Sequence, residues 1–343
     1  METKLVSSWY NLLSSVPTSY VQPPERRPGN AVLATGLKIP VIDLEGQDRD
    51  GIIRNIIKSS EEYGFFQVIN HGVPKEVVED ALRIFKEFHA MPCNEKIRES
   101  SKDPNGSCKL YTSSGRNGED VARYWKDSLQ HPCPPSGEYV HFWPEKPAGY
   151  REAIGKYTQE IRTLGLKILG LISEGLGLDP KYFHGDLTAN SVVISHHYPP
   201  CPEPKLTLGT SRHKDPNILT ILLQQAEIAG LQVFKDGAWI PVDPIPNAFV
   251  VNMGFMLQII SNGRLIGAEH RVVTNPSTAR HTIAYFINPT NETLIEPAKP
   301  VLSATSPPKY VSMTFGELHG QFLNKGPYFE SEFRIQPSQN VKK

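Results

Sequence analysis

The sequence predicts a mainly β protein with flanking helices, in which the β part forms a jelly roll or barrel. After residue 190, short runs rich in β-branched and aliphatic residues alternate with turn signals. One of these turns, in "FKDGAW", holds an Asp-Gly pair, which is the strongest short hairpin signal. Before residue 190, apolar residues recur mainly at helical spacing. The predicted strands of the second half are SVVISHHY, NILTILLQ, GLQVF, AWIPV, AFVVNM, LQIIS, HRVVTN and RHTIAYFI.

The first half of the chain predicts an arm followed by alternating strands and helices. Residues 1–37 are rich in Pro and Ser and predict an arm over the domain, with a short helix around residues 9–13. "KIPVIDL" and "FFQVINHG" predict strands. Between them, "RDGIIRNIIKSSEEYG" predicts a helix that stops at Gly64. Pro74 suits the first turn of the next helix, whose apolar face is Val77, Val78, Ala81, Leu82, Phe85 and Phe88.

A long helix over residues 145–174 is the clearest single element. Its apolar positions alternate steps of four and three, which predicts one continuous buried stripe. Residues 100–148 are rich in Gly, Pro, Ser and Asn and predict irregular structure. "TFGELHGQFLN" predicts a closing helix near the C-terminus. The stripe of the long helix is Tyr150, Ile154, Tyr157, Ile161, Leu164, Ile168 and Leu171.

Composition excludes several classes of function. The 343 residues contain 36 Lys+Arg and 36 Asp+Glu, and this balance argues against a nucleic-acid binder or a polybasic membrane surface. The N-terminus lacks the apolar region of a secretory signal, and the longest apolar stretch, "AFVVNMGFMLQII", is too short to span a bilayer. Four cysteines without CxxC spacing predict reduced thiols and a cytoplasmic location. They are Cys93, Cys108, Cys133 and Cys201.

The segment "TSRHKDPNILTILLQQ" contains the first candidate metal ligands. If "RHKDPN" enters a strand, His213 and Asp215 face one way and Lys214 the other. Two histidines and one carboxylate are the ligand set typical of non-haem Fe(II) oxygenases. An HxD pair alone is a weak signal, and the third ligand should be a histidine on a different strand. His270, in "GAEHRVVTN", opens a β-rich run and suits that role.

A candidate anion site follows ten residues after His270. In "ARHTIAYF", Arg280 and Thr282 are two apart and share one face of the predicted strand. A guanidinium matches a carboxylate with two parallel hydrogen bonds, and a hydroxyl adds a third. An arginine inside a barrel is costly unless it meets an anion. A metal beside such an arginine suggests 2-oxoglutarate as the cosubstrate.

These motifs together resemble the signature of the plant 2-oxoglutarate- and Fe(II)-dependent dioxygenases, in order and in spacing. The wider similarity begins at residue 38 and includes "IPVIDL", "GFFQVINHGVP" and "HHYPPCPEP". "YWKDSLQHPC", "WPEKPAGYREAIGKY" and "IPNAFVVNMG" look most like the hyoscyamine 6-dioxygenase-like and downy-mildew-resistance-6-like members.

The resemblance implies a distorted double-stranded β-helix core, with residues 145–174 packed outside it. It implies that the catalytic iron is bound by His213, Asp215 and His270. It further implies that 2-oxoglutarate is bound by Arg280, Thr282 and Tyr198. The cofactors would be Fe(II), 2-oxoglutarate and O2, with ascorbate as reductant.

The resemblance also implies an activity. The enzyme would hydroxylate, desaturate, epoxidise or demethylate a small plant specialised metabolite, such as an alkaloid or a phenolic, and release succinate and CO2. Small-molecule substrates are the expected partners, without nucleic acid or membrane, and a monomer is expected. Five regions are expected: an N-terminal arm (1–37), an N-terminal dioxygenase region (38–145), a supporting helix and connection (146–190), the catalytic core (191–300), and a C-terminal helix and tail (301–343).

Four residues depart from the pattern of this family. Thr282 stands where serine is usual and keeps the hydroxyl. His196 stands at the usual asparagine and is expected to affect how the cosubstrate lies without being a fourth ligand. Lys214 replaces a commoner threonine and is expected to point away from the iron. Phe255 replaces a common aspartate and is expected to add apolar surface near the pocket.

Two other classes of protein fit part of the pattern. A zinc hydrolase could use the same three ligands, but the sequence has no HExxH motif and Arg280 would have no role. A catalytically silent binding protein would not need the three ligands intact. His71 is expected to be a loop histidine held by backbone hydrogen bonds, and at most one of His196 and His197 can face the metal.

Overall fold

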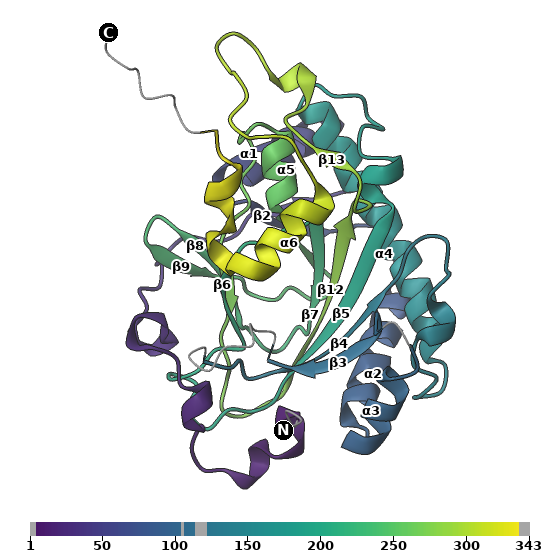
Figure 1. Cartoon of the computed structure of the whole chain (residues 1–343), viewed down its shortest axis with the longest axis vertical. Coiled ribbons are helices and arrows are strands. Elements are labelled where there is room, and N and C mark those ends of the chain that lie inside the picture. Colours follow the sequence, from purple (N-terminus) through teal and green to yellow (C-terminus); the bar gives the residue numbers. More distant parts are fainter. Residues whose placement is uncertain (1–4, 104–105, 114–121, 336–343) are drawn as a thin grey trace.

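The computed structural model describes residues 5–103, 106–113 and 122–335. Across these residues the larger sheet contains eight strands in the order β1-β2-β10-β7-β12-β5-β4-β3 (Figure 1). Only β1 and β2 pair in parallel among the strands described; the other pairs are antiparallel. The strands are β1 (Val41–Asp43), β2 (Phe65–Ile69), β3 (Lys109–Thr112), β4 (Asp127–Pro132), β5 (Asn190–Tyr198), β7 (Leu219–Gln224), β10 (Phe249–Met253) and β12 (Arg280–Asn288).

A smaller sheet completes the β core. Its order, over the described ranges, is β6 (Thr210–His213), β11 (His270–Val272), β8 (Leu231–Lys235) and β9 (Ala238–Pro241). The predicted hairpin joins β8 to β9, and Asp236 and Gly237 both have positive φ, 49° and 83°, as a type I′ turn requires. A short ribbon pairs β13 (Leu294–Ile295) with β14 (Met313–Thr314).

Apolar side chains from both sheets pack against each other between them. Phe65, Tyr198 and Val250 of the larger sheet share one buried cluster with Leu231 and Val233 of the smaller sheet. Two sheets closed over a common core form a jelly roll. The predicted mainly β fold with flanking helices is therefore confirmed.

The helices cover the outer side of the larger sheet and its edges. Figure 1 shows α4 running alongside this sheet, and a Cβ placed on Gly165 of α4 would lie 2.5 Å from Ile287 Cδ1 of β12. Glycine therefore allows the helix to approach the strand closely. No helix in residues 5–103, 106–113 or 122–335 is long and apolar enough to cross a membrane. The helices are α1 (Arg49–Glu62), α2 (Lys75–Ala90), α3 (Cys93–Ser100), α4 (Tyr150–Gly175), α5 (Phe255–Ile260) and α6 (Phe315–Lys325).

Several predicted elements were wrong in type or extent. The region 100–148, predicted to be irregular, contributes β3 and β4 to the larger sheet. "LQIIS", predicted as a strand, lies mostly in α5, because a short apolar run buried on all sides has no period that separates strand from helix. The long helix begins at Tyr150 rather than residue 145. The short helix predicted around residues 9–13 is present as a 3₁₀ helix, Tyr10–Leu12, and a second one spans Val6–Ser8.

Candidate metal and cosubstrate site

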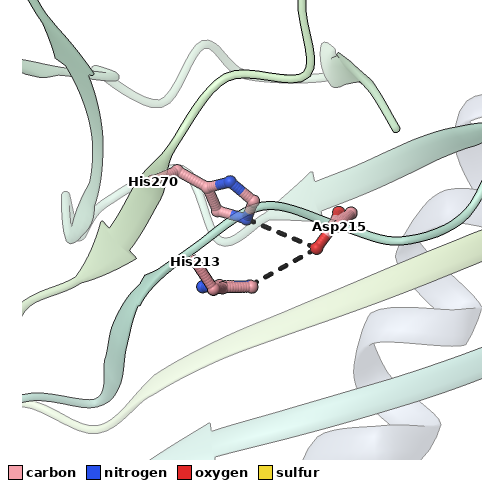
Figure 2. A group of neighbouring side chains, drawn as sticks. All are labelled: His213, Asp215 and His270. Atoms are coloured by element: carbon pink, nitrogen blue, oxygen red, sulfur yellow. Dashed lines mark ion pairs between the residues drawn. The ribbon is translucent and has the colours of Figure 1, made fainter. Parts of the chain in front are cut away.

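His213, Asp215 and His270 come together at one point between the two sheets (Figure 2). His213 ends β6 and His270 begins β11, and the two residues are direct partners in the sheet. Asp215 Oδ1 lies 3.3 Å from His213 Nε2 and 3.6 Å from His270 Nε2. One atom from each residue lies within 4.8 Å of the others, which could hold a metal ion.

Backbone carbonyls orient the two imidazoles. His213 Nδ1–H donates to the Ser211 carbonyl at 2.8 Å, and His270 Nδ1–H donates to the Ala268 carbonyl at 3.2 Å. With Nδ1 occupied, each ring presents Nε2 as the ligand atom. Burial, together with the neighbouring His213, lowers the pKa of His270 to about 4. The neutral imidazole that a metal requires is therefore the stable form at neutral pH.

The second carboxylate oxygen of Asp215 is held by neutral donors. Its Oδ2 accepts hydrogen bonds from Thr220 Oγ1 at 2.7 Å and from Asn252 Nδ2 at 2.8 Å, so Oδ1 remains for a metal. Burial opposes ionisation of Asp215, but His270, His213 and Thr220 together bring its pKa below the ordinary value. Two histidines, one buried carboxylate and hydrogen-bonded outer partners are a donor set that fits Fe(II).

Asp215 lies on a loop after β6, and not on the strand predicted for it. Phe255 N–H donates to the Asp215 carbonyl at 2.8 Å, which ties this loop to the start of α5. A Cβ on Gly254 would lie 1.8 Å from the Asn217 carbonyl oxygen. Only glycine permits this approach, so "NMG" positions the loop that carries Asp215.

Arg280 is buried in the same interior and has an unused donor. The side chain is 1% exposed. Its Nη2 donates to Gln224 Oε1 at 2.7 Å and its Nε to the Ile228 carbonyl at 3.2 Å, whereas Nη1 has no hydrogen-bond partner among the described residues. A buried guanidinium N–H without a partner fits an arriving carboxylate.

Two hydroxyl groups lie beside this guanidinium. Tyr198 faces Arg280 across the β5–β12 pair, and the guanidinium carbon lies 5.4 Å from the Tyr198 ring centroid. Burial raises the pKa of Tyr198, against the opposing effects of Arg280, Thr210 and Thr282. Thr282 shares the strand face of Arg280 and is buried. The three residues expected at the cosubstrate site are therefore adjacent.

The neighbouring histidines His196 and His197 face opposite sides of the sheet, as alternation requires. His196 Nδ1 is hydrogen-bonded to Ser128 Oγ at 2.8 Å, and burial, with Lys126 and Arg280 nearby, holds its pKa well below the usual value. His197 instead bonds to His281 at 2.8 Å on the outer side.

His71 lies in a loop as expected. Its Nε2–H donates to the Asn247 carbonyl at 3.0 Å, and the Val73 N–H donates to its Nδ1 at 3.1 Å. Both ring nitrogens are therefore occupied by backbone groups, and His71 is a structural residue.

Two of the four departures lie on the outer side of the site. Lys214 Nζ donates to Glu330 Oε2 at 2.5 Å, away from the three candidate ligands, as expected. Phe255 is buried, and its ring packs against Tyr310 and Phe333 of the C-terminal region. Its apolar surface therefore packs against the C-terminal segment.

Sequence reasoning missed several polar residues of this interior. Thr220 and Asn252 support Asp215, Gln224 supports Arg280, and Lys126 donates to Thr210 Oγ1 at 3.0 Å. Thr220 and Asn252 could have been found in the sequence, because each is a polar residue within an otherwise apolar strand. Lys126, in "YWKDSL", directly precedes β4 and lies in a region predicted to be irregular.

A jelly roll that brings two histidines and one carboxylate to one point is characteristic of non-haem Fe(II) oxygenases. Comparison with known proteins agrees. Residues 189–289 match the 2OG-Fe(II) oxygenase superfamily, and residues 39–146 match the N-terminal region of the non-haem dioxygenases in morphine synthesis. The chain belongs to the 2OG-Fe(II) oxygenase superfamily and is a dioxygenase that uses Fe(II), 2-oxoglutarate and O2.

The similarity to individual proteins extends over nearly the whole chain. Hyoscyamine 6-dioxygenase of Hyoscyamus niger is 39% identical over 95% of this chain and 96% of its own. Protein DOWNY MILDEW RESISTANCE 6 of Arabidopsis thaliana is also 39% identical, with the same coverage of 95% and 96%. The crystal structure of JOX2 in complex with 2OG, Fe and JA has a TM-score of 0.87 and 34% identity, covering 98% of both chains.

Proposed function

We propose that His213, Asp215 and His270 hold Fe(II), and that Arg280, Thr282 and Tyr198 hold 2-oxoglutarate. The observation that carries this proposal is the pairing of two features in one buried interior. Three metal-ligand atoms lie within 4.8 Å of one another, and the nearby guanidinium of Arg280 has an unused donor at Nη1. A metal can bind the 2-oxo acid end of 2-oxoglutarate, and the Arg280 guanidinium can bind its distal carboxylate. The two features therefore match the two ends of this molecule.

Each group of residues has its own part in the reaction. When bound, Fe(II) supplies the oxidative chemistry, in which 2-oxoglutarate becomes succinate and CO2 while the substrate is oxidised by O2. Arg280 Nη1 would donate to the distal carboxylate, with the Tyr198 and Thr282 hydroxyl groups beside it. Thr220 and Asn252 keep the Asp215 carboxylate ionised and oriented.

The substrate we propose is a small plant specialised metabolite, such as an alkaloid or a phenolic. Relatives named as a hyoscyamine 6-dioxygenase, a flavanone 3-dioxygenase and a flavonoid 7-O-demethylase support this class. Hydroxylation is the proposed reaction, and the same oxidant can also desaturate, epoxidise or demethylate.

We further propose a cytoplasmic monomer, consistent with cysteines that form no disulfide among the described residues.

The two other classes of protein are less favoured. A zinc hydrolase would need no carboxylate at Arg280. The buried guanidinium would then stay incompletely paired, which lowers the stability of the fold. A silent binding protein would not require Asp215 to be held by two separate donors.

The decisive experiment measures metal, cosubstrate and product together. The protein is supplied with Fe(II), 2-oxoglutarate, ascorbate and a panel of plant metabolites under air, and succinate and products are followed by mass spectrometry. A product that carries one added oxygen or lacks two hydrogens, and that depends on 2-oxoglutarate, supports the proposal. Wild-type iron occupancy after alanine replacement of each of His213, Asp215 and His270 would exclude the ligand assignment.

A further inference from the structure

Lys126 is a buried cation inside the site, and the proposed chemistry gives it no role. The residue is 3% exposed, and its Nζ donates one hydrogen bond, to Thr210 Oγ1 at 3.0 Å. An ammonium has three protons to donate. Among the described residues, no carboxylate forms an ion pair with Lys126, and the acidic group that acts on it is Asp215. Burial lowers the pKa of Lys126 to about 7, against the opposing effect of Asp215, so an anionic ligand would be needed to keep the buried amine protonated at neutral pH.

Lys126 and Arg280 lie on opposite sides of Tyr198 in the larger sheet. Arg280 lies on β12, Tyr198 faces it on β5, and Lys126 directly precedes β4 on the other side of β5. Adjacent strands are about 4.8 Å apart, so the backbones of Lys126 and Arg280 are separated by roughly 10 Å. The partner of Lys126, Thr210, lies on β6, the strand that ends in His213. Thr210 is also a hydrogen-bond partner of Tyr198, so Lys126 and Arg280 lie on opposite sides of Tyr198, and Asp215 is the carboxylate that acts on Lys126.

The charges of the loaded site leave room for one more anion. Fe(II), Arg280 and Lys126 together bring one positive charge more than Asp215 and the two carboxylates of 2-oxoglutarate neutralise. Both of those carboxylates already have partners in the proposed arrangement, the metal and Arg280. The surplus positive charge is thus that of Lys126, for which the described residues supply no ion-pair partner.

We propose that Lys126 binds an acidic group of the primary substrate, so that the enzyme selects a metabolite with a carboxylate or a similar oxyanion. This inference rests on the proposed function, because it counts the charges of bound Fe(II) and 2-oxoglutarate. It favours an acidic phenolic over an amine alkaloid, since two buried cations and a metal ion repel an ammonium group.

The test compares substrates that differ only in charge. Cinnamic acid, cinnamamide and cinnamylamine form one series, and octanoic acid, octanamide and octylamine form a second. Each compound is titrated calorimetrically, without O2, into protein loaded with Fe(II) and 2-oxoglutarate. We expect at least one acid to bind about tenfold or more tightly than its amide, as a charge-assisted hydrogen bond predicts, and the amines to bind most weakly.

Variants then assign this preference to Lys126. Lys126→Met should weaken binding of the acid about tenfold while leaving the amide within about twofold, and Lys126→Arg should keep a preference for the acid. Lys156→Met is the matched control, because Lys156 lies on α4 with a side chain 63% exposed. The melting temperature of unloaded Lys126→Met should equal or exceed that of the wild type, since the change removes a poorly paired buried cation.

Several results would overturn the proposal. Equal affinity for acids and amides, or no binding of either acid, contradicts it. A Lys126→Met variant that binds 2-oxoglutarate more weakly but keeps its preference for acids assigns the lysine to the cosubstrate instead. The iron and 2-oxoglutarate titrations that precede the probes report separately on the proposed function, so its failure is recognised before the probes are added.

Discussion

The Thr220 hydroxyl donates a hydrogen bond of 2.7 Å to Asp215 Oδ2, the carboxylate oxygen that does not face the two histidines. The donor and acceptor are both buried. Thr220 lies on β7 of the larger sheet, whereas Asp215 follows β6 of the smaller sheet. This bond therefore orients the proposed metal ligand Asp215 from the opposite sheet.

Thr220→Val should weaken metal binding without changing the three ligands. The substitution keeps the shape of the side chain but removes the hydrogen-bond donor. Loss of a hydrogen-bond partner of a metal ligand typically lowers metal affinity about 10–100-fold. Titration of the protein with Fe(II) without O2 measures the effect. Thr163→Val on the exposed surface of α4, where the hydroxyl bonds to the Gln159 carbonyl, is the control. Equal iron affinity in Thr220→Val and Thr163→Val would show that Asp215 is oriented without this bond.

Arg280→Ala should raise the apparent KM for 2-oxoglutarate about tenfold or more, because a charge-assisted contact is worth roughly 1.5–3 kcal/mol. Arg280→Lys should restore only part of the affinity, since an ammonium lacks the planar fork and cannot also reach Gln224 Oε1 in the same geometry. The measurement is succinate release as a function of 2-oxoglutarate concentration. An unchanged KM in the alanine variant would exclude Arg280 as the anchor.

His196→Asn should retain iron and a measurable part of the activity. His196 bonds to Ser128 and is not within the three-residue cluster of possible metal ligands. An asparagine can keep a hydrogen bond to Ser128, and its main expected effect is a changed affinity for 2-oxoglutarate. Metal content and the KM for 2-oxoglutarate are measured on the same preparation. Loss of iron from this variant would mean that the imidazole itself is a ligand.

Stability should decrease as the pH falls from about 6.5 toward 4. Burial lowers the pKa of His131 to about 3, of His197 to about 4 and of His281 to about 3. The folded values lie below the unfolded value of about 6.5. Between the two values the unfolded chain binds more protons, so unfolding is favoured as the pH falls. At pH 5 each such histidine costs up to about 2 kcal/mol.

Chemical denaturation at several pH values, with a chelator present, measures this dependence. His131→Gln should reduce the slope of unfolding free energy against pH, because it removes one buried neutral imidazole. His184→Asn, at an exposed position, is the control for replacing a histidine. A slope that is the same in His131→Gln as in the wild type would show that His131 does not contribute to the acid sensitivity.

The sequence alone determined the class of fold and most of the candidate site. Periodicity predicted α4 and the jelly-roll strands, and the Asp-Gly pair predicted the β8–β9 hairpin, because these signals depend on neighbours only a few residues apart. The motifs around His213, Asp215, His270 and Arg280 indicated iron and 2-oxoglutarate, since their chemistry depends on residue type and order. The departure at Lys214 was also correctly expected to point away from the cluster.

Tertiary structure decided what depends on contacts between distant segments. Only the paired sheets bring Thr220 and Asn252 to Asp215 and place Lys126 near Thr210, because these residues are far apart in the chain or lie in different sheets. The α5 helix was predicted as a strand because complete burial removes the polar alternation that distinguishes the two. The sequence thus determines which chemical groups are available, whereas packing decides which of them meet, since burial and hydrogen bonding are properties of the assembled sheets.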